Sequence, residues 1–275
     1  MRLSEPEPAA SIPELRRKVD ALREDILEML LESLTGHPGS SLSALEILVA
    51  LYYRVLRFDP SRPDDPDRDR VILSKGHAAP ALYAILIDLG ILPEEARHGL
   101  RQLGSPLQGH PDRRFAAGVD ASTGSLGHGL SMGLGLALGS ARLGRDTTTY
   151  VVLGDGECQE GQVWEAAMAA AHLRLGNLTA IVDWNGLQHD KPIADVMGLD
   201  PLPDKWAAFG WETEELDGHD LDALVEALQR PHDRPLAILA RTVKGHGVPF
   251  MENRAEWHSI KDPDLFEELM AQVRS

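Results

Sequence analysis

The chain has 275 residues, of which 43% are hydrophobic and 25% charged, and its formal net charge is −16. This length allows one large α/β domain or two small ones, and the negative charge argues against nucleic acid or an anionic membrane surface as a partner. The single cysteine, Cys158, excludes a disulfide framework and predicts a packing residue in a cytoplasmic protein.

The first third of the chain predicts helices around one short strand. Residues 1–11 are acidic and proline-rich, without the apolar stretch of a secretory signal, and predict a short flexible arm. Apolar residues recur at helical spacing over 12–34 and predict an amphipathic helix, which a second helix follows at 42–56. A charged loop then leads to a strand at 71–73 and a helix at 78–89.

The stretch 121–141 contains no charged residue and carries two pairs of glycines four residues apart, Gly129/Gly133 and Gly135/Gly139. Such a run can mark a membrane helix. Serine, threonine and histidine interrupt it, however, and glycine is unusually frequent. We therefore expect a buried helix that packs tightly on a sheet.

The segment 147–185 predicts a βαβ unit, around which the rest of the chain is organised. Residues 147–153 and 178–182 predict two buried strands, and the apolar spacing after Glu160 predicts a helix between them. The polar segments 154–156 (Gly-Asp-Gly) and 183–185 (Asp-Trp-Asn) follow the two strands. In a parallel sheet these two segments lie side by side at the carboxyl edge.

That edge suits a diphosphate bound through a metal ion. Asp155 offers a carboxylate, Asn185 an amide oxygen, and the helix that begins near Glu160 offers its N-terminus to an anion. Mg²⁺ prefers such oxygen ligands and takes only a few of them from protein. A bare Gly-Asp-Gly is usually an ordinary turn. Followed by 28 residues and then asparagine, it is similar to the thiamine-diphosphate motif.

The chain after Asn185 predicts a second α/β unit on the same sheet. A long polar loop at 186–206 is expected to lie over the cofactor. Strand, helix and strand follow at 211–216, 221–228 and 236–241, and a helix closes the chain at 263–273. The sequence therefore predicts an α/β fold in which helices flank both faces of a parallel sheet, as one domain over residues 1–275.

Three histidines, His37, His77 and His110, each follow a glycine directly in a predicted loop. A neutral imidazole can donate to a phosphate or a sugar hydroxyl and can move protons near neutral pH. These loops lack the ligand spacing of a zinc site. We expect the three histidines to face a substrate.

Taken together, residues 15–259 resemble the N-terminal, diphosphate-binding part of transketolases. The resemblance is closest to the N-terminal chains of split, two-subunit transketolases. The motifs that carry it stand in the family's order: GHPGSS, RDRVILSKGHAAPALYA, QGHPD, STGSLGHGLSMGLGLALG, GDGECQEGQVWEAAM and TVKGHGV, with WH after it.

The resemblance implies a role for each matching residue. The metal ligands would be Asp155, Asn185 and the carbonyl of Leu187. The cofactor would be thiamine diphosphate with Mg²⁺, contacted by His77, Gly124, Ser125, Leu126, Asp155, Gly156, Glu160, Asn185 and His258. The catalytic groups would be His37, His77, His110 and His258, together with Glu160, which would belong to a carboxylate network between two active sites.

The sequence departs from the family pattern in three places. Lys75 stands where many full-length members have asparagine. Ser125 and His128 lie in a loop that usually reads Gly-Pro-Leu-Gly-Gln-Gly, and Ser259 replaces the glycine that usually follows the last histidine. The first two departures concern substrate detail, and the third concerns the role of His258.

In the family, the glutamate that activates the cofactor lies in a pyrimidine-binding domain, beyond everything that matches here. We therefore expect a partner subunit with the pyrimidine-binding and C-terminal domains, assembled as α2β2. The reaction implied is transfer of a two-carbon ketol unit from a phosphorylated ketose to an aldose. Two alternatives remain: the α subunit of a 2-oxo acid dehydrogenase, and a non-catalytic thiamine-diphosphate-binding module.

Overall fold

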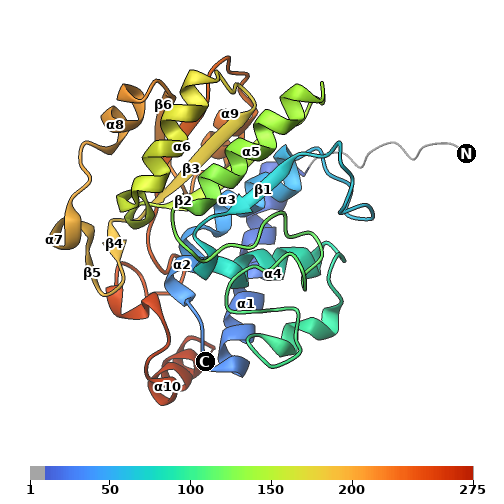
Figure 1. The fold of residues 1–275 in the computed structure, drawn as a ribbon. Helices are drawn as coiled ribbons and strands as arrows, with labels where there is room; N and C mark the ends of the chain where they lie inside the picture. The colour runs from blue at the N-terminus through green and yellow to red at the C-terminus, as the bar shows by residue number, and fades with distance from the viewer. Residues whose placement is uncertain (1–9, 275) are drawn as a thin grey trace, which may run out of the picture.

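The structure, a computed structural model, describes residues 10–274. Its centre is a sheet of five parallel strands in the spatial order β1-β2-β3-β7-β6 (Figure 1). In that order, the strands span Arg70–Leu73, Thr149–Gly154, Leu178–Trp184, Leu236–Arg241 and Glu212–Asp217. Gly154 of β2 lies beside Asp183 of β3, and Trp184 of β3 lies beside Arg241 of β7. The carboxyl ends of these three strands therefore form one edge.

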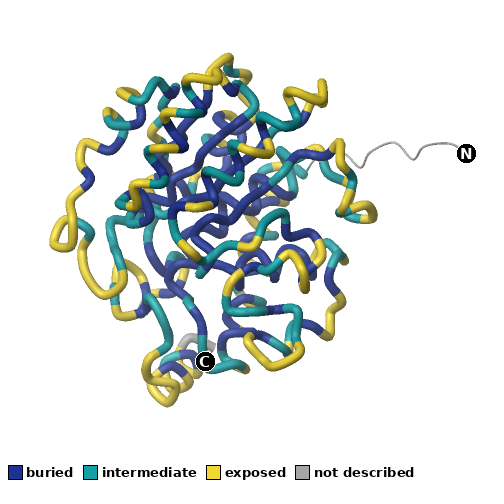
Figure 2. Tube along the Cα trace, viewed as in Figure 1, coloured by how far each residue is buried: buried dark blue, intermediate teal, exposed yellow. Residues whose placement is uncertain are grey.

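Helices cover both faces of the sheet, which confirms the predicted fold class. The helices are α1 (Ile12–Ser33), α2 (Pro38–Ser43), α3 (Leu45–Ala50), α4 (Ala79–Asp88), α5 (His128–Arg142), α6 (Gly161–His172), α7 (Ile193–Met197), α8 (Leu202–Ala208), α9 (Leu221–Gln229) and α10 (Pro263–Arg274). One core packs α1, α3, α4 and α9 on one face, and a second core packs α5, α6 and α8 on the other. Figure 2 shows the buried strands between these layers.

The start of α1 is fixed by local hydrogen bonds. The Ser11 backbone N–H donates to Glu14 Oε2 at 2.6 Å, as in a capping box, and the Ala10 N–H donates to the carbonyl of Tyr53 at 3.3 Å. Ala10 and Ser11 are the last two residues of the flexible arm expected at 1–11. Its first nine residues lie outside the described part of the chain.

The second helix begins earlier than the sequence predicted. We expected it at residue 42, but α2 begins at Pro38, and Ala44 separates it from α3. Proline suits the first position of a helix, because it lacks the N–H that would be unpaired there. A π-helical turn, Leu51–Val55, then completes the segment. The early start places His37 directly at the N-terminal end of α2.

Helix α5 is buried on one side only, so the expected buried helix over 121–141 is partly wrong. The helix begins at His128, and its inward face uses glycine for close contact. A Cβ on Gly129 would lie 2.4 Å from Ser74 Cβ, and one on Gly133 would lie 2.4 Å from Val151 Cγ2. Gly135 and Gly139 face open space. None of the helices in residues 10–274 is long and apolar enough to cross a membrane.

The long loop expected at 186–206 contains a small hairpin. Its two antiparallel strands, β4 (Leu187–Gln188) and β5 (Lys191–Pro192), are followed by α7. The Lys261 ammonium forms an ion pair with Asp190 at 2.5 Å at the hairpin's tip. The hairpin is therefore tied to the segment that precedes α10.

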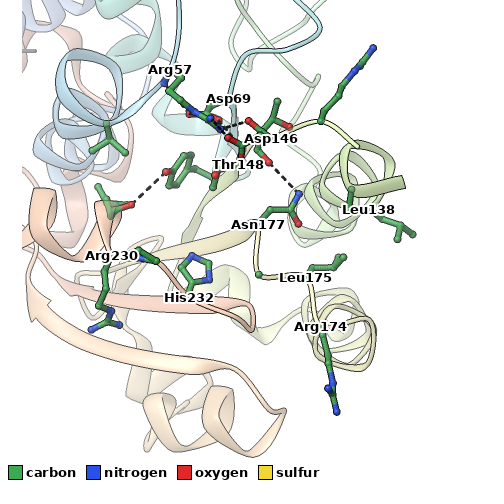
Figure 3. A pocket seen from close by; sticks show the side chains of 18 of the residues that line it. Arg57, Asp69, Leu138, Asp146, Thr148, Arg174, Leu175, Asn177, Arg230 and His232 are labelled. Carbon is green, nitrogen blue, oxygen red and sulfur yellow. Dashed lines mark hydrogen bonds and ion pairs between the residues drawn. The ribbon is translucent and has the colours of Figure 1, made fainter. Parts of the chain in front are cut away.

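A hollow of about 1150 Å³ opens at the opposite, amino edge of the sheet (Figure 3). Arg57 uses its guanidinium there to bind Asp69 and Asp146. Arg142 lies in the last turn of α5, and Arg174 and Arg230 lie at the ends of α6 and α9. A cation at a helix C-terminus stabilises the helix dipole. Stabilisation of the helix C-termini therefore explains why Arg142, Arg174 and Arg230 lie around this hollow.

We predict that a glycine-to-alanine substitution changes the free energy of unfolding in opposite directions on the two sides of α5. We expect Gly129→Ala to lower the free energy of unfolding by about 1–3 kcal/mol, because the new methyl group overlaps Ser74. Gly135→Ala should raise it by up to about 1 kcal/mol, because alanine favours the helix and meets no atom. Urea unfolding of both variants checks this, and equal effects would contradict the packing described.

Candidate active site at the carboxyl edge of the sheet

Asp155 is the first residue after β2, and only 2% of it is exposed. Its Oδ1 accepts the N–H of Gly156 at 2.8 Å, and its Oδ2 accepts the N–H of Gly186 at 2.6 Å. Burial, and then the charge of nearby Asp183, raises the pKa of Asp155 to about 6. Among the described residues Asp155 has no ion-pair partner, so a bound cation would stabilise its charge.

Asn185 and Leu187 lie beside Asp155 and complete the predicted metal-ligand set. The Asn185 side chain accepts the Leu187 N–H at Oδ1, at 3.1 Å, and donates from Nδ2 to Asp183 Oδ1 at 3.4 Å. All three predicted ligands line one small cavity of about 50 Å³. Gln188 lines it too, and its buried Oε1 has no hydrogen-bond partner within residues 10–274. Oxygen donors of this kind fit Mg²⁺.

A buried ion pair forms the floor of the site. Asp183 is fully buried and accepts hydrogen bonds from the Lys75 ammonium, the Ser43 hydroxyl at 2.5 Å and the Thr242 hydroxyl. Burial alone would raise the pKa of Asp183, but Lys75 and these hydrogen bonds hold it below its usual value. Lys75 is only 1% exposed, so this departure from the family pattern is part of the floor.

Four histidines from separate segments meet above this floor. The ring centroid of His37 lies 5.5 Å from that of His77, 5.3 Å from His258 and 6.3 Å from His110. Burial, and then neighbouring positive charges, lower the pKa of His37 to about 4 and that of His258 to about 3. The pKa values of His77 and His110 are lowered for the same reasons. All four imidazoles are therefore neutral at pH 7.

Two further groups belong to this cluster, Lys244 and His189, and neither was predicted from the sequence. Lys244 is 1% exposed, and its Nζ lies 3.3 Å from His258 Nδ1 and 3.4 Å from the carbonyl oxygen of His189. Burial and the charge of Lys75 lower the pKa of Lys244 to about 8. The His189 ring lies 4.6 Å from that of His258. Lysine is rarely fully buried, so a burial argument from sequence would have missed Lys244.

The glycine segment, residues 124–127 directly before α5, lies beside the histidine cluster. Gly124 has a φ of 125° and packs against His110, since a Cβ on Gly124 would lie 2.7 Å from His110 Cγ. Leu126 lines the same cavity as Asp155. Ser125 is exposed and lines a neighbouring shallow hollow with His128. The predicted cofactor contacts Gly156, His77 and His258 also line the cavity.

Glu160 lies outside the cavity around Asp155. It is the exposed residue that precedes α6. It packs near the glycine segment, because a Cβ on Gly127 would lie 2.7 Å from Glu160 Cβ. Its predicted role in a carboxylate network stays a prediction.

A second cluster of titratable groups, Glu46, His219 and His246, lies behind the site. His219 Nδ1 is 3.1 Å from Glu46 Oε2, and the imidazole of His246 stacks on that of His219 at 3.7 Å. The three side chains have the separations of a metal site. However, the Val243 N–H donates to His219 Nε2 at 2.8 Å, so the ring proton sits on Nδ1, which faces Glu46. A metal-bound histidine donates from its second nitrogen instead, so we interpret the cluster as a link between α3 and the loops after β6 and β7.

Comparison with known proteins agrees with this geometry. The family model described as "Transketolase, thiamine diphosphate binding domain" matches residues 15–272. The chain belongs to the transketolase family.

Two relatives illustrate the match within this family. A 6-deoxy-6-sulfo-D-fructose transketolase subunit from a Clostridium species is 42% identical over 251 residues, which cover 90% of this chain and 91% of the relative. A subunit of the apulose-4-phosphate transketolase from Actinobacillus succinogenes has the same identity and coverage. The solved transketolase from Campylobacter jejuni superposes with a TM-score of 0.88 at 27% identity. This match covers 96% of our chain but only 43% of that transketolase, so the chain spans less than half of it.

The buried ion pair between Lys75 and Asp183 can be tested directly by substitution. We expect Lys75→Met to lower the free energy of unfolding by about 3–5 kcal/mol, because it leaves the Asp183 carboxylate buried and unpaired. The double variant Lys75→Met/Asp183→Asn removes that charge and should recover most of the loss. Urea unfolding without cofactor measures both. A loss below about 1 kcal/mol in the single variant would contradict a buried, charged pair.

Proposed function

We propose that this chain is the diphosphate-binding subunit of a two-chain transketolase. It would transfer a two-carbon ketol unit from a phosphorylated ketose to an aldose, with thiamine diphosphate and Mg²⁺. The observation that carries the proposal is the convergence of Asp155, Asn185 and four neutral histidines on one edge of the sheet. The cytoplasmic location expected from the sequence remains a prediction.

The residues present fit both the metal and the diphosphate. Asp155, Asn185 and the carbonyl oxygen of Leu187 would hold Mg²⁺, since all three line one cavity. Lys244 and His77 line the same cavity and would bind the diphosphate as cation and hydrogen-bond donor. When bound, thiamine diphosphate supplies the carbon nucleophile that attacks the ketose carbonyl and carries the two-carbon unit.

The histidines suit a substrate with many hydroxyl groups. Their lowered pKa values keep the imidazoles of His37 and His110 neutral, so each can accept a hydroxyl proton at one nitrogen and donate from the other. His258 and His189 extend the same row of imidazoles. This arrangement favours sugar chemistry over oxidative decarboxylation of a 2-oxo acid, which has no sugar hydroxyl groups to deprotonate.

The partner subunit is part of the proposal. The two relatives named above are themselves called transketolase subunits, and this chain covers about nine-tenths of each. The outer face of α5 and α6 presents exposed Leu136 and Met168, with the open Gly135 and Gly139 beside them. Such a face suits close contact with another subunit. We propose an α2β2 assembly in which Glu160, exposed at the start of α6, faces a neighbouring subunit.

Reconstitution tests the proposed function. We expect the purified chain alone, with saturating thiamine diphosphate and Mg²⁺, to show no ketol transfer. Addition of a partner with pyrimidine-binding and C-terminal domains should produce it. The donor panel should include a phosphorylated and a sulfonated ketose, because the two relatives are named for sugars of these kinds.

Two variants separate the roles in the same assay. Asp155→Ala should abolish Mg²⁺-dependent cofactor binding, because it removes a carboxylate from the proposed metal site.

His110→Ala should leave cofactor affinity nearly intact and lower kcat/KM by about 10²–10⁴-fold, the usual contribution of general acid–base catalysis. Robust transfer by a preparation that contains no second polypeptide would refute the two-chain proposal, and unchanged cofactor affinity in Asp155→Ala would refute the metal site.

A further inference from the structure

Glu157 is a buried carboxylate for which the proposed reaction gives no role. It lies in the short helical turn Gly156–Gln159, two residues after Asp155, and only 3% of it is exposed. It forms no ion pair with any of the described residues. Burial raises the pKa of Glu157, and hydrogen bonds, with a smaller contribution from the nearby charge of Lys75, offset part of that rise.

Those hydrogen bonds come from three different segments. Oε1 accepts from the Ser74 hydroxyl, at the end of β1, and from the backbone N–H of Gly127 at 2.9 Å. Oε2 accepts from the backbone N–H of Gly154, at the end of β2, at 3.1 Å. One carboxylate thus connects the end of β1, the glycine segment before α5 and the end of β2.

Each of these segments carries residues that line the proposed cofactor site. His77 follows Ser74, Leu126 precedes Gly127, and Asp155 follows Gly154. The first two segments also touch directly, because a Cβ on Gly76 would lie 2.7 Å from the Gly124 backbone nitrogen. No shared strand pairing fixes the glycine segment, since it lies outside the sheet.

We propose that Glu157 is a positioning residue that fixes the spacing of the three cofactor-binding segments before the cofactor arrives. It would act through Gly127 and Gly154 and would not touch the cofactor. This inference rests on the proposed function for its consequence, which is tighter cofactor binding. The hydrogen bonds that carry it are features of the chain alone. Loss of the carboxylate would leave the backbone N–H groups of Gly127, which is buried, and Gly154, which is half-buried, without this acceptor, and that disfavours the assembled arrangement.

The test compares three variants of the full chain. Glu157→Gln keeps the size but replaces one accepting oxygen with a donor, and Glu157→Asp keeps the charge but shortens the side chain. The control is Asp120→Asn. Asp120 is also a buried carboxylate, but it binds Arg68, Arg70 and the N–H of Val71 at the start of β1. It therefore reports the general cost of losing a buried acid.

Two measurements are made on each variant: amide hydrogen exchange of the chain without cofactor, and calorimetric titration of its complex with the partner subunit, using thiamine diphosphate and Mg²⁺. We expect Glu157→Gln to lose protection at Gly127 or Gly154, whichever N–H group meets the new side-chain NH₂, and to weaken cofactor binding at least tenfold. Glu157→Asp should recover part of both effects. Asp120→Asn should leave exchange at these two amides and cofactor affinity unchanged, even if its melting temperature falls.

The outcomes separate this inference from the proposed function. If wild type binds the cofactor and Glu157→Gln binds it equally well, the positioning role is overturned. If the wild-type complex with the partner subunit does not bind the cofactor, the proposed function fails, and the exchange data then decide the inference. Unchanged protection at Gly127 and Gly154 in Glu157→Gln would overturn it, and selective loss there would support it.

Discussion

The Asp183 carboxylate, fully buried at the end of β3, is the constraint on which the site depends. A charge in this position is tolerated only when partners offset the cost of removing it from water. Lys75 after β1, Ser43 in α2 and Thr242 after β7 supply those partners. The same bonds hold four separate segments together below the cavity. Neutralising one buried acid therefore fixes the relative positions of these four segments.

The parallel sheet explains why the chemistry gathers at one edge. Consecutive strands end at the same side, so the polar residues that follow β2 and β3 become neighbours. At the other edge helices α5, α6 and α9 end, and arginines lie at or just after their C-termini. The hollow at that edge is larger than the cavity around Asp155. Chemical groups, and not the size of the opening, identify the site.

The sequence predicted the βαβ unit around Asp155 well, because buried strands and polar turns leave strong local signals. It also brought His37, His77 and His110 together through their shared loop context. It placed the second helix at residue 42, because it gave too little weight to Pro38 as a helix start. It also treated 121–141 as a uniformly buried helix, although only Gly129 and Gly133 make close contact with the sheet side.

What the sequence could not predict depends on contacts between distant segments. The burial of Lys75 against Asp183 joins residues 108 positions apart, and Lys244 reaches the histidines only because the loop after β7 folds over them. Glu157 shows the same limit, since its partners Ser74 and Gly127 come from two other segments. A residue's exposure and partners follow from the assembled fold, whereas its tendency to form a strand or turn is local.

The central claim is that the edge between β2 and β3 holds a divalent cation together with a diphosphate. Mn²⁺ accepts the same oxygen ligands as Mg²⁺ and is paramagnetic, so electron–nuclear double resonance can report phosphorus nuclei bound next to it. We predict a ³¹P coupling to protein-bound Mn²⁺ when the chain and its partner subunit are mixed with thiamine diphosphate, and its loss in Asp155→Ala. Mn²⁺ that remains free, or that binds without a ³¹P coupling, would contradict the account.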